Sequence, residues 1–158
     1  MSRPLREQIQ QRRPFASPSE ETFLNLQRTA NLLQQGLTHL LKKRAGGMTP
    51  SQYNVLRILR GAQPEALTCG EIGERLVTPG PDVTRLLDRL EKRGLVARGR
   101  SDGDRRVVRS QITDDGLQVL SELDQPTLDW LEEHLGHLSD EQHGDLSRLL
   151  EHARVAVE

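Results

Sequence analysis

The sequence predicts a mainly helical fold that contains one β-hairpin. Helix-start signals recur along its 158 residues, apolar side chains between them follow a helical period, and residues 95–112 alone read as two strands around a turn. This length suits one domain, or one protomer of an oligomer.

The helix-start signal is a capping Ser or Thr followed three residues later by Glu or Gln. It occurs at Ser17, Thr49, Thr68 and Ser139, with a proline directly after the first two caps. Partial versions begin at Thr78 and at Thr113. We therefore expect six helices, at about 19–44, 50–60, 69–76, 79–93, 114 into the 130s, and 140 to near the end.

The segments 95–100 and 107–112 are expected to pair as strands around the loop SDGDRR, which has Asp-Gly at its centre. The third and fourth helices, separated by about two residues, suit a helix-turn-helix. The predicted fold class is thus a mainly α, winged helix-turn-helix domain between flanking helices.

The composition limits the class of protein. Apolar residues make up 34 % of the chain, a thin core that favours burial against a partner. No apolar run of membrane-spanning length and no signal segment occurs, so we expect a cytoplasmic location without membrane partners. One cysteine excludes an internal disulfide framework. Common catalytic motifs are absent, so we expect that the protein is not an enzyme and uses no cofactor.

Net charge is unevenly distributed. Residues 1–74 carry ten Lys/Arg against six Asp/Glu (+4), residues 75–110 carry ten against five (+5), and residues 111–158 carry two against twelve (−10). A basic middle region suggests a polyanionic partner, although an ordinary solvated surface gives the same pattern.

Residues expected at DNA lie on two adjacent segments. On the fourth helix and just before it, polar residues fall off the apolar face, and Arg85 and Arg89 can bond guanine in the major groove. In the hairpin loop, paired arginines can enter the minor groove, with Asp104 orienting one of them. The expected DNA-binding residues are Thr78, Gly80, Asp82, Thr84, Arg85, Arg89, Arg105 and Arg106. The alternatives are a solvated amphipathic helix and a surface turn with compensating charges.

The segments VTRLLDRLEKRGLVAR and D-x-DRR…(L/I)T-x-x-G, with MTPSQYNVLRIL upstream, resemble the MarR family of bacterial transcriptional regulators. The resemblance covers residues 18–158, with the winged unit at about 49–112, dimerisation helices at about 19–45 and 114–157, and a basic tail at 1–17. The pair Pro79 and Pro81 departs from the family pattern and removes two backbone donors.

The resemblance implies a homodimer that binds a pseudo-palindromic double-stranded operator, represses transcription and releases DNA when a small, often aromatic, effector binds. Two-fold symmetry would place the recognition helices ~34 Å apart. The leucine-rich last two helices, with more apolar residues than one protomer would bury, fit the dimer. The expected ligand cleft contains Leu33, Leu37, Leu41, Tyr53 and Leu56.

Other readings stay open at this point. The winged helix could serve a protein partner without specific DNA binding. Cys69 could sense oxidants or be a small packed residue, and His39, His134 and His137 could bind zinc or be surface histidines, although no metal site is predicted. The tail could contact phosphates, wrap the partner protomer or be disordered.

Overall fold

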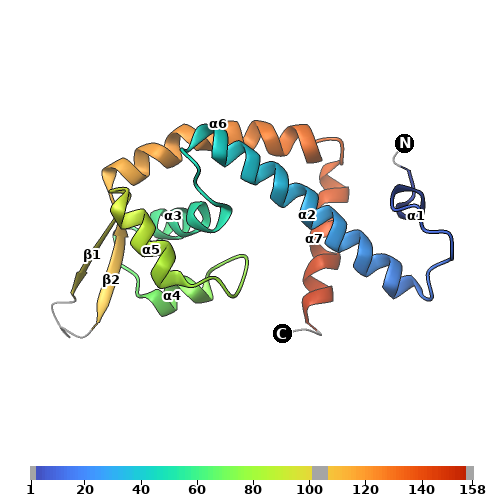
Figure 1. The fold of residues 1–158 in the computed structure, drawn as a ribbon, viewed down its shortest axis with the longest axis horizontal. Coiled ribbons are helices and arrows are strands. Elements are labelled where there is room, and N and C mark those ends of the chain that lie inside the picture. The colour runs from blue at the N-terminus through green and yellow to red at the C-terminus, as the bar shows by residue number, and fades with distance from the viewer. Residues whose placement is uncertain (1–2, 101–106, 156–158) are drawn as a thin grey trace.

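The computed structural model describes residues 3–100 and 107–155, and these form helices with one small antiparallel sheet (Figure 1). Helices α3, α4, α5 and the hairpin gather at one end, while α2 and α6 extend away from them toward α7 and α1. The elements are α1 Leu5–Gln8, α2 Pro18–Arg44, α3 Pro50–Ala62, α4 Cys69–Glu74, α5 Val83–Lys92, β1 Val96–Arg100, β2 Val108–Ile112, α6 Asp114–Leu135 and α7 Asp140–Arg154.

Five of the six predicted helix starts are confirmed by their capping hydrogen bonds. The side chains of Ser17, Thr49, Thr68, Thr113 and Ser139 each accept from a backbone N–H three residues along. Complete capping boxes form at α3, α4 and α7. These ends are predictable because each cap uses only neighbouring residues.

The predicted start of the fourth helix, at Pro79, is wrong. This is the recognition helix, the one expected in the DNA major groove. Helix α5 begins at Val83, and its N-cap is Asp82, whose carboxylate accepts the Arg85 N–H at 3.1 Å. Proline disfavours helical geometry in the residue before it, and Gly80, which precedes Pro81, has a φ of +100°. The prolines therefore extend the turn instead of starting the helix.

The hairpin prediction is confirmed for its strands. β1 and β2 pair antiparallel from Val96 opposite Ile112 to Arg100 opposite Val108. An unpredicted bridge adds Leu67, which exchanges two backbone hydrogen bonds with Ser110 at 3.0 and 2.7 Å. The sheet edge is thereby attached to the residues just before α4.

The apolar core lies at the hairpin end. Leu56 and Leu59 of α3 meet Leu87 of α5, Leu120 of α6 and Leu41 of α2, all at 0–1 % exposure. Farther from this core, large apolar side chains stay exposed on α2, α6 and α7: Phe23, Leu26, Leu32, Leu128, Leu131, Leu146 and Leu149.

The N-terminal region contains a helix that the sequence did not predict. Leu5 of α1 is only 4 % exposed, and it lines a groove together with Leu24 and Leu32 of α2. Arg28 of α2 donates to the Gln8 side chain at 3.2 Å. This short helix therefore forms where α2 provides a surface for it, which its own sequence does not reveal.

Helix α6 begins in direct contact with the backbone that leads into β1. The Thr113 N–H donates to the Leu95 carbonyl at 3.1 Å, and the Thr113 hydroxyl donates to the Gly94 carbonyl at 2.6 Å. A Cβ on Gly116 would lie 2.4 Å from the Leu95 oxygen and 2.7 Å from a side-chain carbon of Ile112. Only glycine allows α6 to start this close.

We predict that Gly116→Ala destabilises the protein by roughly 1–3 kcal/mol, because the added methyl group must push a backbone carbonyl or α6 itself out of place. Thermal and urea unfolding followed by circular dichroism measure this. The matched control is Gly61→Ala in α3, where a Cβ would meet nothing within 4 Å. That variant should be as stable as the parent or slightly more stable. Equal stability of the two variants would contradict the close-contact explanation.

A bidentate ion pair between Arg60 and Asp124 joins α3 to α6. Both terminal nitrogens of Arg60 donate to the Asp124 carboxylate, at 2.8 and 2.9 Å. These bonds lower the pKa of Asp124 below its ordinary value of 3.8 and raise that of Arg60. The side chains stay 34 and 45 % exposed, so solvent screens the pair.

We predict that Asp124→Asn lowers the unfolding free energy at neutral pH by about 0.5–1 kcal/mol. A lowered folded-state pKa means that the carboxylate stabilises the fold above its unfolded pKa and loses this effect as pH falls through the folded value. The difference between parent and variant should therefore shrink below about pH 4. Urea titrations at a series of pH values, with Arg60→Gln and the double variant closing the cycle, check this; a pH-independent difference would refute it.

Candidate nucleic-acid interface

The turn before the recognition helix spans residues 75–82, longer than the two-residue connection that the sequence suggested. It contains Thr78, which was expected just before the helix, and Gly80, which was expected in its first turn; both precede α5. The Asn54 side-chain oxygen of α3 accepts the Val77 N–H at 2.9 Å, and this bond joins the turn to a neighbouring helix.

Helix α5 presents a polar face outward. Leu86, Leu87 and Leu90 are buried, whereas Thr84, Arg85 and Arg89 are exposed. Asp82 has two roles near this face, since it caps α5 and lies 3.3 Å from the Arg85 side chain. The three predicted residues on the helix itself are therefore brought together at the surface.

The acidic residues of α5 are paired from the hairpin. Arg98 of β1 donates to the Asp88 carboxylate at 2.6 Å and, through Nε, to the Glu91 carboxylate at 2.9 Å. Its hydrogen bonds hold the pKa of Glu91 below the ordinary range, so this carboxyl is ionised near neutral pH. The arrangement compensates negative charge beside Arg85 and Arg89 and ties the hairpin to α5.

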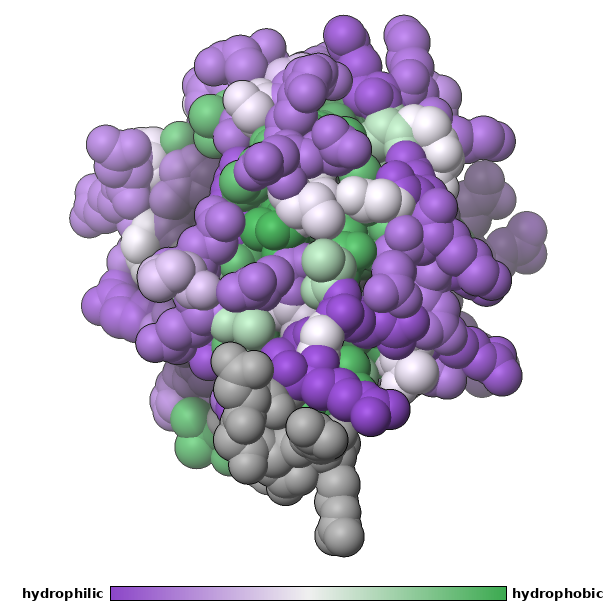
Figure 2. All heavy atoms as spheres, turned by 90° about the vertical axis from the view of Figure 1, so that its left-hand side faces the viewer, coloured by the Kyte–Doolittle hydropathy of each residue, from purple (hydrophilic) through white to green (hydrophobic). Residues whose placement is uncertain are grey.

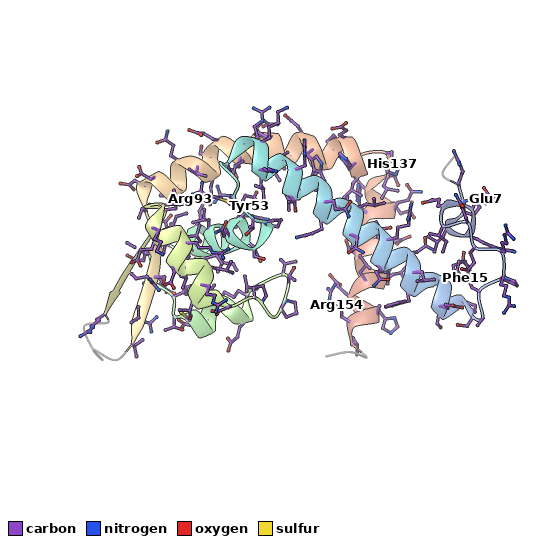
Figure 3. All side chains as sticks on the ribbon, in the orientation of Figure 1. Glu7, Phe15, Tyr53, Arg93, His137 and Arg154 are labelled. Atoms are coloured by element: carbon purple, nitrogen blue, oxygen red, sulfur yellow. The ribbon has the colours of Figure 1, made fainter. Side chains whose placement is uncertain are left out.

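Other basic residues also stabilise the unit. Arg109 of β2 donates to the Ala66 carbonyl at 2.8 Å and lies 3.4 Å from Glu71. Arg93, just after α5, donates to the Ala45 carbonyl at the end of α2 at 2.8 Å (Figure 3). The charge pattern had placed these arginines in one basic region, and sequence alone gave no signal that they have structural partners.

The hairpin end of the molecule is largely hydrophilic (Figure 2). The predicted contacts Arg105 and Arg106, and the predicted orienting residue Asp104, lie outside the described residues. The described part of the hairpin ends at Arg100, which lies opposite Val108. The contacts of the hairpin loop with DNA remain a prediction.

The predicted ligand cleft is only partly matched by a pocket. Leu37 and Tyr53 line an opening of about 170 Å³ between α2, α3 and the turn before α5 (Figure 3). Leu41 and Leu56 are instead fully buried in the core, and Leu33 does not line the pocket. Helical periodicity identified the inward residues but not which of them meet open space. The other lining residues are Gln34, Pro50, Ser51, Asn54, Arg57, Leu76, Val77 and Thr78.

The alternative sensor residues lie on α4, on α2 and at the end of α6. Cys69 is half-buried in α4 and packs against the core. His39 and His134 line one shallow pocket, and the His134 ring lies 2.8 Å from the Trp130 carbonyl oxygen. Within residues 3–100 and 107–155, no group of three or more His, Cys, Asp or Glu side chains is placed to hold a metal ion. In the same described part of the chain, no helix is long and apolar enough to span a membrane.

Comparison with known proteins identifies the family. Residues 46–107 match the model of the MarR family. A MarR transcription factor from Planctomyces limnophilus is 38 % identical, and the alignment covers 87 % of this chain and 98 % of that one, with a TM-score of 0.67. The transcriptional repressor MdtR of Bacillus subtilis is 36 % identical over 59 % of this chain and 57 % of its own length, so this chain spans less than two thirds of that relative.

A second solved structure has a similar fold at lower sequence identity. Sco3205 of Streptomyces coelicolor, a MarR regulator solved in complex with DNA, has a TM-score of 0.80 at 23 % identity and covers 91 % of this chain and 94 % of its own. The winged helix-turn-helix fold is thus confirmed. The match to the family model and the likeness to the Planctomyces protein, which covers 87 % of this chain, show that the chain belongs to the MarR family of transcriptional regulators.

Proposed function

We propose that this chain binds double-stranded DNA and represses transcription by occupying an operator. The observation that carries the proposal is the exposed set Thr84, Arg85 and Arg89 on α5 beside an arginine-rich hairpin. A helix with such residues fits the major groove, where guanidinium groups bond guanine and threonine meets thymine or phosphate.

The likeness to a regulator solved with DNA and to a named repressor supports this assignment. In the proposed complex Thr78 and Gly80 lie at the edge of the interface, and Asp82 acts by capping α5 and holding Arg85. Arg105 and Arg106 reach the neighbouring minor groove, where narrow A·T-rich segments attract arginine.

We propose further that the acting species is a homodimer. The exposed apolar side chains of α2, α6 and α7 lie away from the winged unit, where a second copy can cover them. Two-fold symmetry then presents two recognition helices to a pseudo-palindromic site, about 34 Å apart. The acidic C-terminal third belongs to these dimer helices, and its charge stays away from the phosphates.

A small-molecule effector is the third part of the proposal. The pocket beside Tyr53 lies between α2, which belongs to the dimerisation part, and the turn that leads into α5. A ligand can change DNA affinity only if it favours one arrangement of these parts over the other. The position of the pocket supports the proposal, because a ligand bound there would contact both parts.

The proposal is tested by binding of the purified protein to DNA from its own upstream region and to a scrambled duplex, across a salt series. We expect selective binding by a dimer, measured by light scattering and fluorescence anisotropy, that weakens steeply with salt as phosphate counterions are released. Equal, weak binding to a library of genomic duplexes would refute operator recognition. It would favour the other candidate, a winged helix that serves a protein partner.

We predict that Arg85→Ala weakens operator binding by roughly 1–3 kcal/mol and relaxes the base preference at one position per half-site. The measurement is a competition titration against operators with single base changes. Arg148→Ala on α7 is the matched control, because Arg148 also pairs with an aspartate three residues earlier and is similarly exposed, at 75 % against 79 %. Equal losses in the two variants would exclude base reading by Arg85.

A further inference from the structure

The turn that precedes the recognition helix has few contacts of its own. Val77 is 83 % exposed, and Thr78, Pro79 and Gly80 are exposed as well. Among the hydrogen bonds of the described residues, the bond from the Val77 N–H to Asn54 is the one that joins residues 77–81 to a helix. Asn54 itself sits in the middle of α3, whose neighbours Tyr53, Val55 and Leu56 are buried.

Two prolines restrict the backbone between Val77 and α5. Pro79 and Pro81 have ring-restricted φ angles, and Asp82 is held by its capping bond to the Arg85 N–H. The prolines reduce the number of backbone torsions that can absorb a displacement at Val77 before it reaches the start of α5. Thr84 and Arg85 lie in this first turn, so they move with it.

We propose that Asn54 is a positioning residue for DNA recognition. Its side-chain oxygen holds the Val77 N–H against the buried helix α3, and through the proline-restricted turn it sets where Thr84 and Arg85 meet the bases. It contacts no DNA itself. The inference rests on the proposed function and adds to it the residue that fixes the recognition helix relative to the core.

The exposure of Val77 distinguishes this role from ordinary stabilisation. When the Asn54 oxygen is removed, water can bond the free N–H, so the loss of folding stability is small. What water cannot replace is the fixed position of the turn. The expected signature is a loss of operator selectivity without a matching loss of thermal stability.

Two variants of Asn54 test the proposal. Asn54→Ala removes the acceptor, whereas Asn54→Asp keeps an oxygen of the same reach. We expect Asn54→Ala to weaken operator binding by about tenfold, with scrambled-duplex binding unchanged and a melting temperature within a few degrees of the parent. Asn54→Asp should restore most of the operator affinity. Asn25→Ala on α2 is the control, because among the hydrogen bonds of the described residues the side chain of this exposed asparagine donates only to the Glu21 carbonyl of its own helix, and it should bind as the parent does.

Amide hydrogen exchange provides a readout that needs no DNA. The Val77 N–H should lose protection in Asn54→Ala and regain it in Asn54→Asp. Lost protection with unchanged operator affinity would overturn the positioning role alone, and so would equal loss of affinity in both variants. A parent protein that does not prefer its operator over scrambled DNA would overturn the proposed function, and the inference with it.

Discussion

The architecture depends on a backbone contact where α6 begins. Thr113 bonds both carbonyls of the Gly94-Leu95 pair, and Gly116 leaves room for the Leu95 oxygen. The hairpin, the recognition helix and the long helix α6 therefore meet at one rigid junction. Because interiors transmit displacement instead of absorbing it, the direction of α6 is fixed relative to α5 and the hairpin. The T-x-x-G motif of the sequence is explained by this steric requirement.

Arginine has two distinct roles in the winged unit. Three arginines join parts of the unit by charge-assisted hydrogen bonds. Arg93 links the end of α5 to the end of α2, Arg98 links β1 to α5, and Arg109 links β2 to the residues before α4. Arg85 and Arg89 are exposed on α5. Arg98 also pairs two carboxylates of α5, so Arg85 and Arg89 lie in a less negative local field. The basic residues of this segment thus include some that hold the fold together and others that are available for the proposed contacts with DNA.

The sequence predicted what local interactions decide. Caps at Ser17, Thr49, Thr68, Thr113 and Ser139 use neighbouring residues only, and the hairpin strands carry their own turn signal. Features that depend on distant partners were missed: helix α1, the Leu67 bridge and the structural arginines. The start of α5 was misplaced because prolines can begin a helix or extend a turn, and the φ of Gly80 decides between them. The roles of residues 104–106 and the contacts of α5 with DNA stay predictions.

The sequence Pro79-Gly80-Pro81 has a consequence for the thermodynamics of recognition. Each proline reduces the number of backbone conformations that the free protein samples. In the proposed complex with DNA, a turn restricted in this way before binding loses little conformational entropy, which favours rapid docking in a single orientation. The same prolines have no N–H groups to offer to phosphates. In that complex, the contribution of this turn to DNA affinity must therefore come from side chains. It depends on their geometry more than on the number of backbone contacts.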